Sequence, residues 1–491
     1  MRSSSGSLIP LLALLALAVA WTAAVADALA WPDTELAAHA RAWFAMLRAD
    51  DAAARRFLDQ HFAPSALAEV TVEERLRRRA TVLERTRGLT PQEVLESTPT
   101  SLSVRCAAGN GDVVVTTFGA EPAAPHRLLG VRIEAEAGGN GPGGGGARAM
   151  EKAPPIDDAE AVKQIRAHLD AHEKAGQFSG VALLARGDST LLSGAWGLAD
   201  REQHTPIDPE TRFNLASIGK LFTRAAVAQL AESGKLSLDD KLSRYLPDFP
   251  HADSITIDML CRHRSGVGDF FNDAYRAMDR SKLRHNRDYL ALIRNQPLWF
   301  APGTSERYSN GGYALLGEVI AKASSEDYYD YLAKHVFAPA GMRSTGYPIE
   351  GDGTPHLAHG YTVEDSSGAE ERDNAASRPA RGSAAGGGYA TAGDLLGFDR
   401  ALLAGKLCGR AWAEWVTGGP RPDRFGSKPS GEAPGFGFGG GAPGISTEWL
   451  HEGDITLIVL TNRDPQVTQP VLEPVRALVR RMRAPARRGG S

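Results

Sequence analysis

Apolar residues recur at steps of three and four along residues 37–62 and 72–86, which predicts two amphipathic helical stretches. The pattern then changes to alternating apolar and polar positions, the period of half-buried strands. Three such runs follow one another, at residues 101–107, 112–119 and 126–137. Helices followed by consecutive antiparallel strands predict a small α+β domain over residues 31–136, whose role the sequence does not define.

A second and longer stretch, residues 154–483, has helical patterns at both ends and in its middle. The helical patterns cover residues 159–176, 217–233 and 469–483, and the strand patterns cover residues 180–187, 191–199 and 455–462. Strands near both ends can share one sheet only if distant parts of the chain come together. We therefore predict an α/β sandwich for this stretch.

The segments outside these two domains carry separate signals. Residues 137–153 are predicted to be a linker, because eight of the fourteen residues 137–150 are glycine or proline. An apolar run, Leu8–Ala20, follows a basic residue and precedes two Ala-x-Ala sites. It is too short to span a membrane, so residues 1–30 are predicted to be a secretory signal peptide, with an uncleaved anchor as the alternative. Residues 484–491 are predicted to form a solvated basic tail.

Composition narrows the range of functions. The formal net charge of -4, with 42% hydrophobic and 23% charged residues, is that of an ordinary globular protein and favours neither nucleic acid nor a membrane surface as a partner. The three cysteines form no disulfide framework and no metal-binding spacing; at most one bridge could form, and we expect three buried free thiols. We also expect that the protein needs no metal or organic cofactor. With the signal peptide removed, we expect a periplasmic or extracellular protein without a stable membrane span, whose oligomeric state the sequence does not define.

The stretch FNLASIGKLFT places Ser217 three residues before Lys220 at the start of a helical pattern. Residues at i and i+3 share one helix face, so the lysine amine can reach the serine hydroxyl. A serine becomes a nucleophile when a nearby base takes its proton, and the apolar flanks would lower the lysine pKa enough for that. The alternative for this spacing alone is an N-capping serine with a solvated lysine. The same stretch lacks the residues of a phosphate-binding loop, and the chain has no Gly-x-Ser-x-Gly motif.

Two further stretches carry candidate chemistry. Tyr308 and Asn310 stand two residues apart before a helical pattern, where a tyrosine can act as a general base and an amide can orient a substrate. Alternatively, they are a packing tyrosine and an N-capping asparagine. In GFGFGGGAPG, glycines on an edge strand let a ligand approach the backbone, whose N–H groups can stabilise an oxyanion. Alone, this stretch also fits a flexible loop.

Together these stretches, in this order, resemble the serine β-lactamase and penicillin-binding-protein superfamily, and most closely its class C-like and esterase-like branch. The resemblance extends from about residue 156 to residue 483. It rests on FNLASIGKLFT, GKLSLDDKLSRYLPDFP, ITIDMLCRHRSGVGDFF, PLWFAPGTSERYSNGGYALLGEVI, GMRSTGY and GGGYATAGDL. It implies a β-lactamase/transpeptidase-like α/β sandwich, with an antiparallel sheet flanked by helices and an additional all-helical region.

The resemblance also implies roles for individual residues. Ser217 would be the nucleophile, Lys220 the first proton acceptor and Tyr308 the family's tyrosine base. Asn310 would orient Lys220 and the substrate, and the backbone N–H of Ser217 would form half of the oxyanion hole. His263 matches a family histidine that we expect to be structural.

One motif departs from the family pattern. Where the family carries a lysine or a histidine on the strand beside the nucleophile, the best alignment places Phe438, followed by Gly439 and Gly440. Gly441 would then supply the second oxyanion N–H. Phenylalanine offers a substrate carboxylate no charge or hydrogen bond. Arg463 is a candidate replacement for that contact, with a surface turn as the alternative.

These residues predict an exported serine hydrolase that forms an acyl-enzyme with a small ester, amide or peptide, with an ester preferred. One alternative is a penicillin-binding-like binding module with little or no turnover. Another is a β-lactamase or a D-Ala-D-Ala carboxypeptidase or peptidase.

Overall fold

The computed structural model describes residues 29–109, 113–135, 154–363, 371–422 and 435–482. The chain divides into two compact units, residues 1–153 and 154–491. The predicted linker, the predicted basic tail and residues 1–28 of the predicted signal peptide lie outside the described residues. Within the described ranges, no helix combines the length and the apolar character needed to cross a bilayer.

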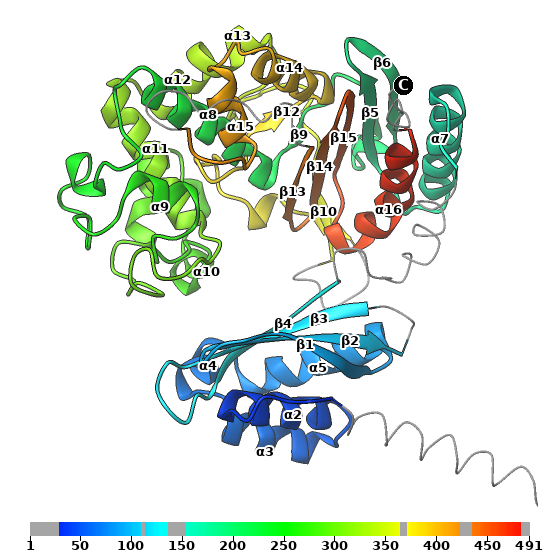
Figure 1. Ribbon diagram of the computed structural model, residues 1–491. Helices are drawn as coiled ribbons and strands as arrows, with labels where there is room; N and C mark the ends of the chain where they lie inside the picture. The colour runs from blue at the N-terminus through cyan, green and yellow to red at the C-terminus, as the bar shows by residue number, and fades with distance from the viewer. Residues whose placement is uncertain (1–28, 110–112, 136–153, 364–370, 423–434, 483–491) are drawn as a thin grey trace, which may run out of the picture. The chain divides into compact units, whose positions relative to one another are not determined.

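The N-terminal unit contains helices followed by a four-stranded antiparallel sheet in the order β1-β2-β3-β4 (Figure 1). Its elements are α2 (Glu35–Leu47), α3 (Asp51–His61), α4 (Pro64–Glu69), α5 (Val72–Thr86), β1 (Leu89–Ser97), β2 (Ser101–Ala108), β3 (Val113–Ala120) and β4 (Leu128–Ala135). The continuous helical pattern over residues 37–62 is broken into α2 and α3, because the Asp50 side chain caps α3 by accepting a hydrogen bond from the Ala53 N–H at 2.7 Å. Strand β1 was not predicted, since its two register irregularities remove the alternation of apolar positions.

The second unit is built on a five-stranded sheet in which every neighbouring pair is antiparallel, in the order β13-β14-β15-β5-β6. The strands are β5 (Gly180–Arg186), β6 (Ser189–Trp196), β13 (Phe436–Ala442), β14 (Ile445–Glu452) and β15 (Ile455–Thr461). Pairing of β15 with β5 joins the two ends of the unit, as the strand patterns predicted. Strand β13, which carries the glycine run, lies at one edge of this sheet.

Helices cover both faces of this sheet (Figure 1). On one face lie α7 (Asp158–Lys174) and α16 (Pro465–Arg481), which pack against each other. On the other face lies α14 (Ala392–Leu403), beyond which a helical region extends away from the sheet. The predicted α/β sandwich, with an antiparallel sheet flanked by helices plus an all-helical region, is therefore confirmed.

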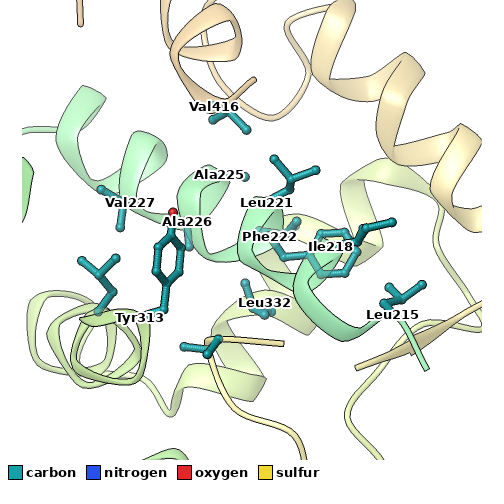
Figure 2. Packing of buried hydrophobic residues seen from close by; sticks show 14 of the residues in the cluster. Leu215, Ile218, Leu221, Phe222, Ala225, Ala226, Val227, Tyr313, Leu332 and Val416 are labelled. Atoms are coloured by element: carbon teal, nitrogen blue, oxygen red, sulfur yellow. The ribbon is translucent and has the colours of Figure 1, made fainter. Parts of the chain in front are cut away.

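The helical region is organised around α8 (Gly219–Glu232), the helix that follows the Ser217–Lys220 motif. Figure 2 shows Leu221, Phe222 and Ala225 of this helix surrounded by apolar side chains from other segments, among them Tyr313 and Leu332. These side chains are almost completely buried, so the helix is held on several sides at once. Burial of this kind fixes the position of the helix start, where the candidate nucleophile lies.

Shorter elements complete the second unit. The helices are η1 (Ala216–Ile218), η2 (Leu242–Arg244), α9 (Ile257–Cys261), α10 (Asp273–Ala277), η3 (Arg280–Lys282), η4 (Asn286–Leu292), α11 (Asn310–Ser324), α12 (Tyr328–Leu332), η5 (Ala333–Phe337), α13 (Ala338–Ala340), η6 (Ala375–Ser377) and α15 (Arg410–Val416). Three two-stranded pairs join β7 (Leu198–Asp200) to β8 (Thr205–Pro206), β9 (Phe213–Asn214) to β12 (Tyr389–Ala390), and β10 (Tyr361–Thr362) to β11 (Arg372–Asp373). The three cysteines are free and buried, as expected.

Candidate active site

The turn that presents Ser217 is held by a distant loop. Ala216, directly before the serine, has a left-handed backbone with φ of 42°. Its N–H donates to the Asn214 side chain at 2.9 Å, and its carbonyl accepts from the Gly387 N–H at 3.1 Å. The backbone of Gly386 passes so close to Ala216 that a side chain there would meet the Ala216 carbonyl. These contacts fix a conformation that a non-glycine residue rarely adopts.

Lys220 lies one turn further along, with only 6% of its surface exposed. Its Nζ lies 3.2 Å from the Ser217 Oγ, 2.7 Å from the Asn310 Oδ1 and 2.6 Å from the Ala385 carbonyl. Loss of water around the amine lowers its pKa to about 7, although the charge of Asp269 opposes this change. The structure therefore brings the predicted serine and lysine together, with the lysine buried rather than solvated.

Tyr308 reaches the same serine from the start of α11. Its hydroxyl donates to the Ser217 Oγ at 2.6 Å, while 47% of the residue remains exposed. Desolvation of the phenol raises its pKa, with the hydrogen bond to Ser217 acting in the opposite direction. Tyr308 is therefore a neutral hydrogen-bond donor at neutral pH, rather than a resting phenolate.

His263 packs beside this tyrosine and does not approach the serine. Its ring lies 4.5 Å from the Tyr308 ring, centroid to centroid, and its Nδ1 accepts a hydrogen bond from the Ser309 N–H at 3.2 Å. Desolvation and then the charge of Lys220 lower the histidine pKa to about 4. His263 is thus neutral at ordinary pH and supports the tyrosine by packing.

Asn310 is the first residue of α11, and the helix is capped by its neighbour. The Ser309 Oγ accepts from the Gly312 N–H at 2.9 Å and donates to the Gly268 carbonyl at 3.1 Å. The capping role considered for Asn310 therefore belongs to Ser309. With its cap supplied, Asn310 directs its carboxamide between Lys220 and Asp269, a carboxylate that sequence reasoning did not select.

The glycine strand passes directly beside the nucleophile turn. A Cβ on Gly440 would lie 2.5 Å from the Leu215 carbonyl oxygen and 3.1 Å from the Ala216 Cβ, so only glycine fits there. Gly441, the next residue, lines the cleft in front of Ser217. The role of the Gly441 N–H as an oxyanion donor stays a prediction.

Phe438 lies two residues before Gly440, on the same face of β13. Its ring packs against Phe436 at 5.6 Å and Trp449 at 6.2 Å between centroids, and it is absent from the described residues that line the cleft. Arg463 also lies away from this lining and pairs with Glu371 at 2.6 Å. Whether Phe438 contacts a substrate stays a prediction.

The cleft itself has a volume of about 970 Å³ and opens in front of Ser217, Tyr308 and Asn310. Aromatic side chains form part of its lining, namely those of Phe270, Phe271, Tyr275 and Tyr289. Phe271 is 53% exposed, an unusual state for a large apolar side chain. Among the residues that the structure describes, no group of three or more His, Cys, Asp or Glu side chains could hold a metal ion.

The arrangement can activate a serine without a metal ion. A neutral lysine amine has two N–H donors and one lone pair. Its two shortest contacts, to the Asn310 and Ala385 oxygens, use the donors, which leaves the lone pair for the Ser217 hydroxyl. The Tyr308 hydroxyl, meanwhile, donates to the serine oxygen. Such a site can remove a proton from the serine and return one later.

The fold is that of the serine β-lactamase and penicillin-binding proteins. A family model described as Beta-lactamase matches residues 165–480, which is more than half of the chain. The chain therefore belongs to the β-lactamase family, and the predicted family membership and fold are confirmed.

Known proteins place the chain within this family. Penicillin-binding protein 4* of Bacillus subtilis (strain 168) is 34% identical over 193 residues, 38% of this chain and 43% of that protein. The crystal structure of a penicillin-binding protein from Bacillus halodurans has a TM-score of 0.56 and 30% identity, covering 63% of this chain and 99% of that one. The crystal structure of the D-amino acid amidase from Ochrobactrum anthropi SV3 in complex with L-phenylalanine has a TM-score of 0.55 and 25% identity. The match covers 65% of this chain and 96% of the amidase chain. The chain spans about half the length of the curated relatives that it matches first.

Proposed function

We propose that this protein is an exported serine hydrolase that cleaves an ester or an amide through an acyl-enzyme, with esters preferred. The observation that carries the proposal is the position of the Ser217 Oγ, which lies between the Tyr308 hydroxyl at 2.6 Å and the Lys220 amine at 3.2 Å. One group offers a proton and the other offers a lone pair, which are the two functions that a serine nucleophile needs.

In the proposed reaction, the neutral Lys220 amine takes the proton of Ser217 as the Oγ attacks the substrate carbonyl. The backbone N–H groups of Ser217 and Gly441 would stabilise the tetrahedral oxyanion. Tyr308 donates a proton to the leaving group and recovers one from the Lys220 ammonium, which holds the former serine proton, because the acylated serine itself carries none. Water then attacks the acyl carbonyl and loses a proton to the site. That proton passes to the Ser217 Oγ as the acyl group leaves. No step requires a metal or an organic cofactor.

The cleft supports a substrate with an apolar group and without a carboxylate. Phe271 and its aromatic neighbours offer apolar surface beside the nucleophile. Two arginines also line the cleft, but Arg378 pairs with Glu350 at 3.2 Å, and the Arg381 Nε donates to the Tyr347 carbonyl at 2.8 Å. Because Phe438 stands where the family carries a lysine or histidine and offers a carboxylate no charge or hydrogen bond, we favour esters over β-lactams or D-Ala-D-Ala peptides, which carry a carboxylate. The similarity to an amidase solved with phenylalanine is consistent with an aromatic substituent.

The first competing proposal is a D-Ala-D-Ala carboxypeptidase or β-lactamase, which the similarity to penicillin-binding proteins favours. The second is a binding module with little turnover. A substrate panel separates the three functions: p-nitrophenyl acetate and butyrate, a D-phenylalanine amide, a D-Ala-D-Ala peptide and a chromogenic cephalosporin. Fastest turnover of the butyrate ester supports our proposal, and fastest turnover of the peptide or the cephalosporin contradicts it.

The nucleophile is tested by covalent labelling with a fluorophosphonate probe. The wild-type protein should be labelled, and Ser217→Ala should not. Ser281→Ala removes the hydroxyl of an exposed serine outside the cleft and is the matched control, which should be labelled like wild type. Equal labelling of wild type and Ser217→Ala would overturn the proposal, and labelling without turnover of any substrate would favour the binding module.

A further inference from the structure

Asp269 divides its hydrogen bonds between the catalytic cluster and the aromatic side of the cleft. Its Oδ2 accepts from both the backbone N–H and the side-chain Nδ2 of Asn310, at 3.1 and 2.9 Å. Its Oδ1 accepts from the backbone N–H of Phe271 at 3.0 Å. One carboxylate thus connects the residue that touches Lys220 to the exposed phenylalanine of the cleft.

The bond to Nδ2 decides which way the Asn310 amide faces. A carboxamide presents an oxygen on one side and an NH2 group on the other. With the NH2 group on the Asp269 carboxylate, the Oδ1 must face Lys220, where it accepts at 2.7 Å. The reversed amide would set two donors against each other at the lysine and two acceptors against each other at Asp269. Asp269 therefore selects the orientation that leaves the lysine lone pair free for Ser217.

The loop that carries Asp269 is itself fixed at several points. The Gln296 Nε2 donates to the Asp269 carbonyl at 2.8 Å, and the Ser309 Oγ donates to the Gly268 carbonyl at 3.1 Å. Gly311, in the first turn of α11, approaches the Gly268 carbonyl too closely for any side chain. Because the loop and the helix start are held together in this way, the carboxylate has a defined position relative to Asn310.

Asp269 also contributes charge to the lysine site. The other groups that face the Lys220 amine are the rings of Tyr308 and Tyr313, at 4.7 and 5.4 Å, and the imidazole of His263. His263 is neutral and Tyr308 is protonated at ordinary pH, as described above. Burial lowers the lysine pKa, and the negative charge of Asp269 partly offsets this change by raising the same pKa.

We propose that Asp269 is the positioning residue of this active site, which holds the Asn310 carboxamide in the orientation that Lys220 requires without touching the substrate. This inference rests on the proposed function, because it assigns a role to Asp269 in activating Ser217. The same carboxylate also accepts a hydrogen bond from the backbone N–H of Phe271, on the aromatic side of the cleft.

The test is the pH dependence of the second-order rate of fluorophosphonate labelling, measured for wild type and Asp269→Asn. The substitution keeps the shape of the side chain and removes its charge. Without the anion the lysine pKa falls, so the midpoint of the acidic limb should move down by about half a pH unit or more. The maximal rate should fall by about tenfold or more, because Asn310 is no longer held in one orientation.

Two further variants separate charge from geometry. Asp269→Glu keeps the charge but moves the oxygens, so its rate should fall while its midpoint stays near that of wild type. Asp273→Asn removes a fully exposed carboxylate four residues away and should change neither quantity. Thermal unfolding of each variant identifies any that fail to fold. If Asp269→Asn fails, an Asp269→Glu rate lowered at a wild-type midpoint supports the inference, and a wild-type rate or a midpoint lowered by about half a pH unit or more overturns it.

The inference is overturned if folded Asp269→Asn labels with the wild-type midpoint, or if the Asp269→Glu midpoint shifts as far as that of the asparagine variant. Failure of the proposed function gives a different result. In that case Ser217→Ala would be labelled like wild type, whatever the behaviour of the Asp269 variants.

Discussion

Tyr308 donates its phenolic hydrogen to the Ser217 Oγ across 2.6 Å, although the two residues are 91 positions apart. Because its pKa is raised, the tyrosine offers a proton at neutral pH and does not compete with Lys220 as the resting base. Tyr308→Phe should therefore lower kcat for p-nitrophenyl butyrate by about 10²-fold or more, with little change in unfolding temperature.

The matched control for this variant is Tyr275→Phe, which removes another hydroxyl from the cleft lining. That hydroxyl donates to the Ser377 carbonyl at 3.4 Å and has no bond to Ser217. The control should keep near-wild-type turnover. A Tyr308→Phe variant with kcat within threefold of wild type would show that the tyrosine is not needed for proton transfer.

The pH dependence of turnover should report the titration of Lys220. Only the neutral amine can accept the serine proton, and burial lowers the lysine pKa to about 7. The value of kcat/KM should therefore rise with pH through about 7 and level off above it. An acidic limb centred near 4 would instead indicate His263, whose pKa is lowered to about 4, and a profile flat between pH 5 and 9 would contradict the role of the lysine.

The glycine strand can be tested by a pair of adjacent substitutions. In Gly440→Ala, the new Cβ would lie 2.5 Å from both the Leu215 carbonyl oxygen and the Thr447 Oγ1, so the nucleophile turn or the strand must move. In Gly439→Ala, the nearest atom would be 3.8 Å away, an ordinary contact. We expect loss of fluorophosphonate labelling in Gly440→Ala only. Loss of labelling in both variants, or in neither, would contradict the close approach described here.

Two phenylalanines are expected to respond in opposite ways. Phe271 lines the cleft and is half-exposed, so Phe271→Ala should raise KM for an aromatic ester about threefold to tenfold without lowering the unfolding temperature. Phe438 packs on Phe436 and Trp449, so Phe438→Ala should cost about 1–3 kcal/mol of unfolding free energy. Its KM should be unchanged. If Phe438→Ala alters substrate preference instead, this ring contacts the substrate.

Short sequence patterns predict those features of this protein whose geometry is local. The Ser217–Lys220 pair was predictable because three residues on a helix fix its geometry, and α8 follows as expected. The strands with strong apolar patterns, β5 and β15, were also predictable. Strand β14 was not predicted, because its sequence ISTEWLHE carries buried polar residues, including Thr447 and Glu448, that hide its pattern.

Partners supplied by tertiary contacts could not be predicted. Asp269 lies 41 positions from Asn310, and no local spacing links the two. The carbonyl of Ala385 is a backbone group, which any residue could supply. Phe438 is a similar case: the alignment gave its position along β13, whereas its contact with Trp449 is set by the pairing of β13 with β14.

The three partners of the Lys220 amine lie 3, 90 and 165 positions away along the chain. Only the first partner, Ser217, is local in sequence. A growing polypeptide that has just completed α8 therefore lacks the other two partners of the amine, Asn310 and Ala385. The strand that borders the nucleophile, β13, is added later still. If Ser217 is the nucleophile, we expect it to become reactive only near the end of synthesis, and truncated chains that lack β13 should not be labelled. In refolding experiments, recovery of labelling should mark completion of the native contacts rather than formation of the helices.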